Sequence, residues 1–275
     1  MKFTKWQGCG NDFVFVYVPD GDVSPYVSQC EKICDRHFGI GADGMIFVLP
    51  SEAADLRMRI FNADGSEAEM CGNGIRCFSL WARELGLVAG SKFSVETGAG
   101  ILVPEILPDG TVRVDMGAPI LKAADVPVVG LGEGSVVSET LWVENLGRTF
   151  DVTAVSMGNP HCVIFTDDIS DKALYTYGPE IEKNAHFPKK VNVEFVKQID
   201  EKTLRMRVWE RGAAVTLACG TGSCATGVAA VLNGRIEKEA KILLDGGELS
   251  VEWEKGGHVF MTGPAQKVFE GEMAL

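Results

Sequence analysis

The first half of the chain contains patterns typical of strands and of amphipathic helices. Residues 55–62 place Leu56, Met58 and Ile60 in alternation with arginines, which is the period of a half-buried strand. Residues 73–85 instead repeat apolar side chains at helical spacing, and Gly86 ends this pattern. The apolar face of the predicted helix consists of Ile75, Phe78, Trp81, Ala82 and Leu85. Further predicted elements are strands at 12–18, 92–97, 99–107 and 111–116, and a helix from Ser24-Pro25 to about Gly39.

The second half repeats this plan. A small, apolar helix is predicted at 223–232, and another helix covers part of 171–184, where Gly178-Pro179 is expected to interrupt it. The strand patterns lie at 137–146, 150–157, 161–166, 191–197, 203–209, 240–245, 248–254 and 258–262. Many short strands with few helices in each half indicate an α+β architecture.

The two halves also share sequence at a constant offset of 148 positions (204 minus 56). Leu56–Arg59 recurs as Leu204–Arg207, and Cys71–Gly74 corresponds to Cys219–Gly222 without any gap between the two matches. Other pairs at this offset are Asn11 with Asn159, Asn62 with Glu210, and Gly86 with Gly234. We therefore predict two pseudo-symmetric domains from an internal duplication, each a curled, mostly antiparallel sheet around a central helix.

The boundary between the two copies is predicted near Gly117-Ala118-Pro119. The N-terminal domain then comprises residues 1–117 and carries Cys71, and the C-terminal domain comprises 118–263 and carries Cys219. Residues 264–275 lie beyond the second copy, so we expect them to return to the N-terminal domain and complete it.

Composition narrows the class of protein. With 46% hydrophobic and 23% charged residues, the 275-residue chain is typical of a globular protein. Its net charge of -12 argues against nucleic acid or an anionic membrane as a partner, although a pocket can still bind an anionic substrate. The N-terminus has no signal-peptide pattern, and no window approaches the ~18 apolar residues of a membrane helix, so we expect a cytoplasmic protein. Its eight cysteines should be mostly thiols, with Cys30, Cys34 and Cys162 as packing residues.

The two related cysteines, Cys71 and Cys219, each precede a predicted helix. The unpaired backbone N–H groups at a helix start favour an anion, so they lower the pKa of a thiol and can hold a substrate carboxylate. Two such thiols, one as base and one as acid, suit a reaction that moves a proton between the two faces of a carbon beside a carboxylate. This scheme requires no cofactor, and the sequence signals none.

Other uses of these cysteines stay open at this point. Cys71 with Cys77 and Cys219 with Cys224 could form two halves of a zinc site, but their spacings exceed those typical of structural zinc ligands. Buried structural thiols are a second alternative. A phosphate-binding loop is a third, although neither turn has the glycine and lysine spacing of such loops.

Several polar residues strengthen the catalytic interpretation. Each of four asparagines stands beside a predicted strand end, and Glu210-Arg211 ends the strand that corresponds to the one ending at Asn62. Taken singly, asparagine is usual in turns and a Glu-Arg pair is usual at the surface. Related by the repeat, Glu210 and Arg211 become candidates for binding an ammonium and a carboxylate group, and His161 could tune a nearby thiol. The four asparagines are Asn11, Asn62, Asn159 and Asn192.

Four motifs in this order resemble those of the diaminopimelate epimerase family. They are Gly8–Phe13, Phe61–Cys77, Met157–His161 and Ala218–Gly222, and the resemblance extends from residue 3 to Ala265. It implies a cofactor-independent, homodimeric enzyme without a metal, which interconverts LL- and meso-diaminopimelate in bacterial lysine and cell-wall precursor synthesis.

The resemblance also implies roles for particular residues. Cys71 and Cys219 would form the acid/base pair, and His161 and Glu210 would modulate the pKa values of the thiols. The helix-start groups would hold the reacting carboxylate, and the asparagines with Glu210 and Arg211 would hold the distal amino-acid head. The implied substrate contacts are Asn11, Asn62, Gly72, Asn73, Asn159, Asn192, Glu210, Arg211, Gly220 and Thr221.

Two departures and two rival interpretations accompany this resemblance. Gly44 stands where some members carry a substrate-contacting glutamine, and Ala214 stands where many members have glycine. A relative with the same fold, such as a proline or hydroxyproline racemase, would act on a substrate that has no second head for Glu210-Arg211 to bind. A non-catalytic or metal-binding protein would use its thiols structurally, and zinc analysis with thiol titration would identify it.

Overall fold

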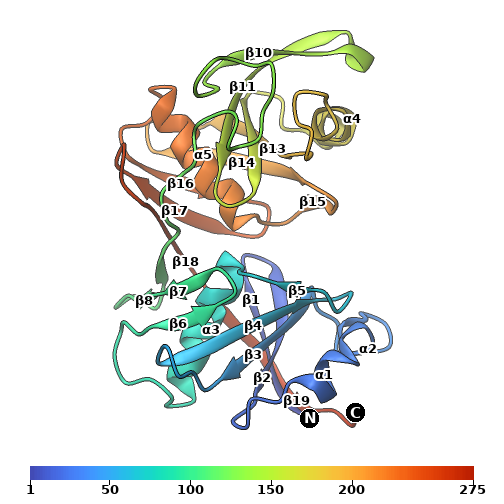
Figure 1. Ribbon diagram of the computed structural model, residues 1–275, viewed down its shortest axis with the longest axis vertical. Coiled ribbons are helices and arrows are strands. Elements are labelled where there is room, and N and C mark those ends of the chain that lie inside the picture. The colour runs from blue at the N-terminus through green and yellow to red at the C-terminus, as the bar shows by residue number, and fades with distance from the viewer. The chain divides into compact units, whose positions relative to one another are not determined.

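The computed structural model describes residues 1–275 and divides them into two compact units (Figure 1). Unit 1 contains Met1–Asp115 together with Thr262–Leu275, and unit 2 contains Met116–Met261. Each unit consists of one strand-rich sheet with few helices, so the predicted α+β class is confirmed. No helix has the length and apolar character needed to cross a membrane.

The sheet of unit 1 has the strand order β19-β1-β2-β3-β4-β6-β7, and β5 pairs with β4. Its neighbours are antiparallel except for the parallel pairs β2/β3 and β4/β6. The elements of unit 1 are β1 (Lys2–Gly8), β2 (Asn11–Tyr17), α1 (Ser24–Val27), α2 (Cys30–Cys34), β3 (Gly44–Leu49), β4 (Leu56–Asn62), β5 (Glu67–Ala68), α3 (Gly72–Glu84), β6 (Val95–Thr97), β7 (Gly100–Leu102), the hairpin β8 (Glu105–Ile106) and β9 (Val112–Asp115), and β19 (Gln266–Glu272).

Within unit 2 the strands follow the same plan in the order β10-β11-β12-β13-β14-β16-β17-β18, with β15 paired to β14. The parallel pairs β12/β13 and β14/β16 take the places of β2/β3 and β4/β6. The elements of unit 2 are β10 (Glu139–Val143), a 3₁₀ turn (Glu144–Leu146), β11 (Arg148–Ser156), β12 (Pro160–Phe165), α4 (Asp171–Glu182), β13 (Asn192–Gln198), β14 (Thr203–Glu210), β15 (Ala214–Thr216), α5 (Gly220–Leu232), β16 (Glu239–Leu243), β17 (Glu248–Trp253) and β18 (Val259–Gly263), on which the chain returns to unit 1.

The duplication also determines the strand register. In unit 1, β2 and β3 place Phe13 beside Gly44, and in unit 2, β12 and β13 place His161 beside Asn192. Both residues of each pair differ by the same 148 positions (161 minus 13, 192 minus 44). Residues at this offset therefore occupy equivalent places in the two sheets, which allows the two candidate sites to be compared residue by residue.

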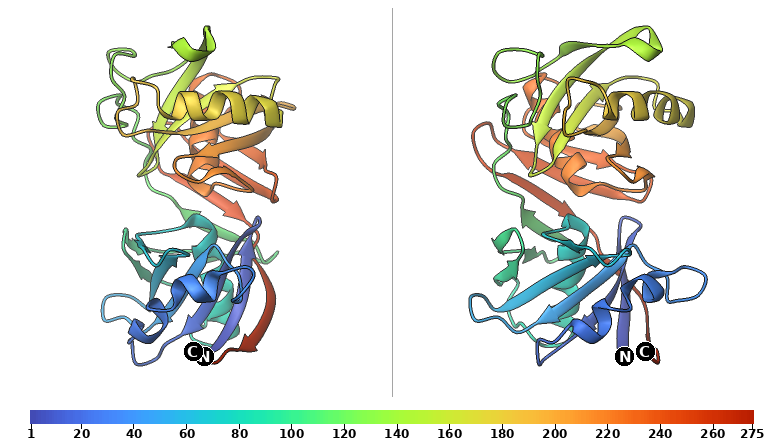
Figure 2. Two further views of the ribbon diagram at one scale, coloured as in Figure 1. Left: turned by 90° about the vertical axis from the view of Figure 1, so that its right-hand side faces the viewer. Right: turned by 45° about the vertical axis from the view of Figure 1, so that its right-hand side comes forward.

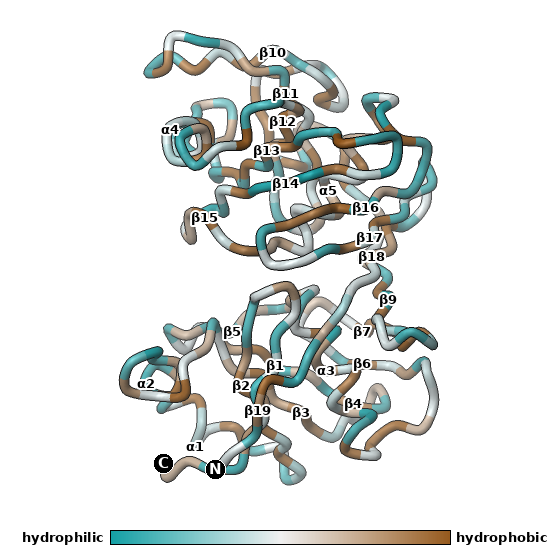
Figure 3. Tube along the Cα trace, turned by 180° about the vertical axis from the view of Figure 1, so that it is seen from behind, coloured by the Kyte–Doolittle hydropathy of each residue, from teal (hydrophilic) through white to brown (hydrophobic).

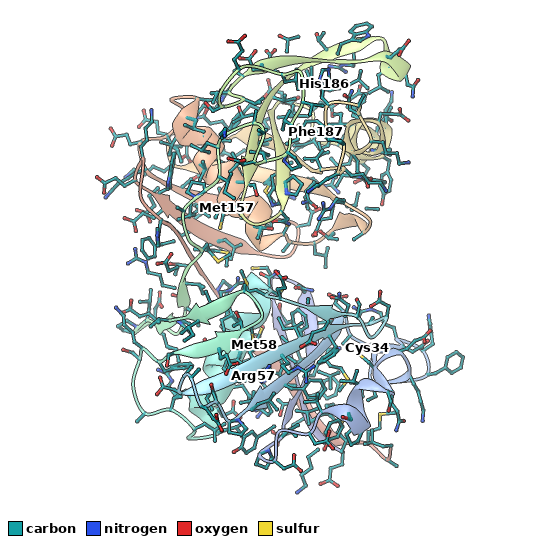
Figure 4. All side chains as sticks on the ribbon, in the orientation of Figure 1. Cys34, Arg57, Met58, Met157, His186 and Phe187 are labelled. Atoms are coloured by element: carbon teal, nitrogen blue, oxygen red, sulfur yellow. The ribbon has the colours of Figure 1, made fainter.

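Burial follows the sequence pattern closely. On β4, Met58 is buried and Arg57 is exposed, as the alternation predicts (Figure 4). All six residues of β3 are buried, and Figure 3 shows this strand as hydrophobic along its length. Cys30 and Cys34, the first and last residues of α2, are both buried, and their sulfur atoms lie 3.9 Å apart. The prediction that they are packing residues is confirmed.

Helix α3 is the central helix of unit 1 and contacts strands β1, β2, β3 and β4. Figure 2 shows the strands of this unit wrapping around it. Ile75, Phe78, Trp81 and Ala82 are buried as predicted, but Leu85 is 41% exposed because it follows the last helical turn. In unit 2, α5 contacts β11 to β14, β16 and β17, and its small residues let it lie close to them.

The predicted helix between Ser24 and Gly39 was wrong. The segment forms two short helices, α1 and α2, which end at Val27 and Cys34. Asp35 has an extended backbone, and its carboxylate accepts hydrogen bonds from the N–H groups of His37 and Phe38, both at 2.7 Å. This local turn competes with the continuation of the helix and replaces its last predicted turn.

Two further expectations need correction. The strand predicted at 99–107 divides into β7 and β8 around Pro104, because proline lacks the N–H group that a strand would donate there. Helix α4 continues through Pro179 although an interruption was predicted. Gly178 explains part of this continuity, because a Cβ at this position would lie 2.6 Å from the Trp209 ring. The missing side chain lets α4 pack directly onto β14, and this packing holds the helix across the proline.

Ala214 adopts a backbone conformation that favours glycine, with φ at 61°. For an L-residue with a Cβ this conformation costs about 1–2 kcal/mol. We expect Ala214→Gly to raise the free energy of unfolding by about 1 kcal/mol, as urea denaturation will measure. Ala213, whose φ is not positive, provides the matched control: Ala213→Gly should lower the same free energy by about 0.5–1 kcal/mol. Equal effects of the two substitutions would contradict the assignment of strain to Ala214.

Asp12 forms a charge cluster with Lys5 and Arg36 in unit 1. From this cluster we predict that the stability of the protein depends on pH. Burial tends to raise the pKa of Asp12, but hydrogen bonds and charges from Arg36 and Lys5 outweigh it and lower the pKa to about 2. A carboxyl whose folded pKa is depressed stabilises the protein above its unfolded pKa and loses this contribution as the pH falls. We expect about 2 kcal/mol from Asp12 at pH 7, lost between about pH 4 and pH 2. Asp12→Asn should therefore have a lower free energy of unfolding than wild type at pH 7, and the two values should converge at low pH. Urea denaturation across this range will measure both.

Candidate active site

Cys71 lies at the N-cap position of α3. Its backbone is extended, with φ at -140° and ψ at 121°, and its sulfur accepts a hydrogen bond from the Gly74 N–H at 3.5 Å. The thiol therefore sits at the positive end of the helix, among backbone donors that the helix itself cannot pair. Gly72 and Asn73 form the first turn and are buried in the unit.

Asn11 and Asn73 join Cys71 in a hydrogen-bonded group. The Asn11 Oδ1 atom accepts from the Cys71 thiol at 3.5 Å and from Asn73 Nδ2 at 3.2 Å. The other end of the Asn11 amide donates to Asp43 Oδ2 at 2.7 Å. Since a carboxylate can only accept, Asp43 fixes the amide with its oxygen toward Cys71. Asn73 is held in turn by Arg76, a fully buried residue whose Nη2 donates to Asn73 Oδ1 at 2.8 Å.

Asn62 and Gly44 lie opposite each other where β3 and β4 pair. The Asn62 side chain is exposed and donates to Ser66 Oγ at 3.0 Å, within its own turn and not in the Cys71 group. Gly44 has no space for a side chain, because a Cβ there would lie 2.4 Å from the Phe61 carbonyl oxygen. The glutamine contact expected in some relatives therefore has no equivalent here.

Cys219 repeats the geometry of Cys71 at the N-cap of α5. Its φ and ψ are -126° and 112°, and its sulfur accepts from the Gly222 N–H at 3.3 Å. The Thr221 hydroxyl lies 3.6 Å from the same sulfur, within the first turn that Gly220 begins. Gly222 is required by this packing, because a Cβ would lie 3.2 Å from the Cys219 sulfur and 2.7 Å from Glu194 Oε1.

Asn159 and His161 connect to this turn. Asn159 Nδ2 donates to Thr221 Oγ1 at 3.2 Å, and Asn159 Oδ1 lies 3.0 Å from His161 Nε2. The other ring nitrogen of His161, Nδ1, lies 2.7 Å from Glu194 Oε1. The side chains of His161 and Glu194 are both completely buried.

Glu210 adjoins Cys219, and each group affects the ionisation of the other. Burial raises the pKa of Cys219 well above its usual value, and the negative charges of Glu210 and Glu194 add to this, while hydrogen bonds from Thr221 and the Gly222 N–H oppose it. Burial likewise raises the pKa of Glu210, although hydrogen bonds from Thr216 and the Cys219 thiol lower it. The Glu210 carboxylate is thus placed to accept the thiol proton of Cys219.

Asn192 and Arg211 form the outer part of this region. Asn192 uses both ends of its amide within the protein: Nδ2 donates to the Pro160 carbonyl at 2.9 Å, and Oδ1 accepts from the Arg211 N–H at 2.9 Å. Asn192 thereby fixes the backbone of Arg211. The exposed Arg211 side chain donates from Nη1 to the Lys189 carbonyl at 3.1 Å, and its planar guanidinium group suits a carboxylate.

The two groups therefore gather most of the predicted residues, each within its own unit. Hydrogen bonds link Asn11, Cys71 and Asn73 in unit 1, and Asn159, His161, Thr221, Cys219 and Glu210 in unit 2. Sequence reasoning missed three charged residues that orient these groups, Asp43, Arg76 and Glu194. A signal existed for Glu194, which is a carboxylate between the apolar residues Val193 and Phe195.

The remaining cysteines do not assemble a metal site. Cys77 is fully buried, and burial raises its pKa to about 12. Cys224 is also buried, within α5. No group of three or more His, Cys, Asp or Glu side chains has an arrangement that could hold a metal ion.

Comparison with known proteins adds an independent observation. The family model described as diaminopimelate epimerase matches residues 3–122 and 153–268. A diaminopimelate epimerase from Pelotomaculum thermopropionicum is 49% identical to this chain, with 99% of this chain and 98% of the relative covered.

Solved structures with low sequence identity share the fold. A phenazine biosynthesis protein of the PhzF family from Bacillus anthracis has a TM-score of 0.72 at 19% identity, covering 100% of this chain and 99% of its own. A probable proline racemase from Agrobacterium radiobacter, solved with bound carbonate, has a TM-score of 0.69 at 16% identity, covering 100% and 93%.

Proposed function

Because this chain belongs to the diaminopimelate epimerase family, we propose that it interconverts LL-2,6-diaminopimelate and meso-diaminopimelate without a cofactor. One observation carries the proposed mechanism. Two cysteines at equivalent positions of a duplicated fold each cap a helix N-terminus with a backbone N–H directed at the sulfur. Cys71 and Cys219 are accordingly the acid/base pair.

The proposed reaction moves one proton at a time and leaves the total unchanged. The thiolate of one cysteine removes the α-proton from one face of the carbon, and the electron pair is delocalised into the adjacent carboxylate. The thiol of the other cysteine then donates its proton to the opposite face. Backbone N–H groups at the two helix starts stabilise the charge that develops on the carboxylate. At the end the two cysteines have exchanged roles, which suits a reversible epimerisation.

Substrate binding is divided between the two ends of diaminopimelate in this proposal. Gly72, Asn73, Gly220 and Thr221 belong to the two first helical turns, so their backbone groups are suited to the reacting carboxylate. Arg211 and Glu210 offer opposite charges for the distal carboxylate and ammonium groups. The remaining proposed contacts come from Asn11, Asn62, Asn159 and Asn192, and His161 modulates the thiols through the hydrogen bonds described above.

Proton NMR in D₂O under reducing conditions tests the proposed function directly. With LL-diaminopimelate as substrate, we expect the meso form to appear with deuterium at one α-carbon. The probable proline racemase with the same fold makes proline and related acids the substrates to try next. Exchange with proline but not with diaminopimelate would move the function to that class. No exchange with any of them would refute the acid/base role of the thiols.

The proposal extends to assembly and location. The family resemblance leads us to propose a homodimer that acts in the cytoplasm. Sedimentation equilibrium of the purified protein will test the dimer, because a monomer mass of 29.6 kDa and twice that value are readily separated. Fractionation of cells that express the chain will test the location.

A further inference from the structure

Glu194 is a buried carboxyl group in strand β13, between the buried residues Val193 and Phe195. Its side chain has no exposed surface, and its Oε1 atom lies 2.7 Å from His161 Nδ1. The second oxygen, Oε2, is buried and has no hydrogen-bond partner. A carboxylate in such surroundings is unfavourable unless hydrogen bonds or a positive charge compensate it, and the ring of His161 is the group in contact with it.

The equivalent positions in unit 1 are apolar. Subtracting 148 from 194 and from 161 gives Ile46 and Phe13, both buried. The strand registers agree, since β3/β4 pair Ile46 with Ile60 as β13/β14 pair Glu194 with Val208. The adjoining glycines also correspond. A Cβ added at Gly74 would lie 2.7 Å from Ile46 Cδ1, and a Cβ added at Gly222 would lie 2.7 Å from Glu194 Oε1. The fold thus accepts an apolar pair here, so folding alone does not require the charges.

The charged pair begins a chain of hydrogen bonds that ends at Cys219. Glu194 accepts from His161 Nδ1, and His161 Nε2 faces Asn159 Oδ1 at 3.0 Å. Asn159 Nδ2 then donates to Thr221 Oγ1, which leaves the Thr221 hydroxyl proton to point at the Cys219 sulfur. Since both oxygens facing the ring accept, this direction places a proton on both ring nitrogens of His161.

In unit 1 the equivalent asparagine has the opposite amide orientation. Asn11 is the equivalent of Asn159, and Asn73 is the equivalent of Thr221. There the carboxylate of Asp43 takes the Asn11 amide nitrogen, so the amide oxygen faces Cys71 and accepts from it. Equivalent asparagines therefore present opposite ends to the two cysteine turns, because the groups that orient them differ.

We propose that Glu194 is a positioning residue for Cys219, acting through His161, Asn159 and Thr221. By accepting the Nδ1 proton, the carboxylate holds His161 in its doubly protonated form. The imidazolium ion orients the Asn159 amide, and the amide directs the Thr221 hydroxyl proton to the Cys219 sulfur. The inference rests on the proposed acid/base role of Cys219, since the chain of donors stabilises the thiolate of this residue.

Glu194→Gln separates this role from a simple charge effect. The titratable groups facing Cys219 are Glu210 from β14, Glu194 from β13 and His161 from β12. The negative charge of Glu194 raises the pKa of Cys219, so the loss of this charge alone would lower that pKa, whereas the loss of the Thr221 donor would raise it. The Asn159 amide then turns over and accepts from Thr221, and the sulfur loses its hydroxyl donor.

The kinetic test measures epimerisation by Glu194→Gln between pH 6 and pH 10. We expect kcat to fall about 10- to 100-fold with KM changed less than about threefold, as for residues that orient a reacting group. The limb of the pH profile that reports Cys219 ionisation should move upward by about one pH unit. Glu182→Gln is the matched control: this buried carboxylate in the same unit accepts from Trp209 Nε1 at 2.8 Å, and its loss should not move the limb. A limb that stays in place or moves to lower pH in Glu194→Gln, with wild type active, would overturn the proposal.

A second measurement does not depend on catalysis or on the folding of one variant. With ¹⁵N-labelled histidine, the four histidines of wild type give few enough signals to assign, and those of His161 vanish in His161→Phe/Glu194→Ile. We expect protons on both ring nitrogens of His161 at pH 7, and a bare nitrogen there would overturn the proposal. The double variant copies the apolar pair of unit 1, so it should unfold at no lower urea concentration than wild type. If wild type fails to epimerise while His161 is doubly protonated, the proposed function fails and the orientation of the network stands.

Discussion

Replacing Cys71 with alanine lowers the rate of diaminopimelate epimerisation by at least about 10³-fold, and replacing Cys219 with alanine has the same effect. Each thiol serves one face of the α-carbon, so loss of either leaves no complete path between the epimers. Groups that act as one unit are not additive. The double variant should therefore be no slower than either single variant, as a coupled or NMR assay of kcat/KM will measure.

Serine variants separate the two faces. In Cys219→Ser, Cys71 can still remove and return the α-proton on its own face, so deuterium should enter one epimer from D₂O without epimerisation. In Cys71→Ser the other epimer should exchange. Exchange of both epimers in either variant would contradict a scheme in which each thiol serves one face.

Buried cysteines outside the two turns provide matched controls. Cys34→Ala in unit 1 and Cys162→Ala in unit 2 remove thiols of the same size from the packed interior. Each creates a small cavity and should lower the free energy of unfolding by about 1 kcal/mol. Activity per folded molecule should stay within about twofold of wild type. A large loss in these controls would show that thiol removal damages the fold generally.

The parts of this molecule that could be predicted from sequence have strong local signals. The central helix at α3 follows from apolar spacing and Gly86, and β4 follows from strict alternation. The duplication strengthens these predictions, because a weak pattern that recurs at one constant offset supports the same element in both halves. The two cysteine turns were predictable for the same reason, and the structure places both at helix N-caps.

The residues that orient the candidate site were not predictable in this way. Asp43 reaches Asn11 only after β2 and β3 have paired, and Arg76, one helical turn from Asn73, becomes fully buried only after α3 has packed. Their functions depend on which amide end they contact, and no sequence period encodes this. Glu194 is the exception, since comparison with Ile46 across the repeat would have marked it. In α1 and α2, a local turn at Asp35 overrode the expected helix.

Replacing Glu210 with glutamine lowers kcat by about 100-fold and removes the acid limb of the pH profile. The ionised carboxylate accepts the thiol proton of Cys219, so the enzyme is active only above the pKa of Glu210. Burial raises this pKa, and the limb should therefore lie higher than that of an exposed glutamate. Glutamine cannot take up the proton at any pH. A rise in KM with unchanged kcat would show instead that Glu210 contributes only to substrate binding.

Thr216→Val tests the same assignment by removing a hydrogen-bond donor to Glu210. The Thr216 hydroxyl donates to Glu210 Oε1 at 2.5 Å, and this hydrogen bond lowers the pKa of the carboxyl. Valine has nearly the same shape but no donor, so the pKa of Glu210 should rise further. Because the pKa of Glu210 rises, the acid limb of the pH profile should move to higher pH. Activity near neutral pH should then fall, while kcat on the alkaline plateau is kept. An acid limb that stays in place in Thr216→Val would assign it to a group other than Glu210.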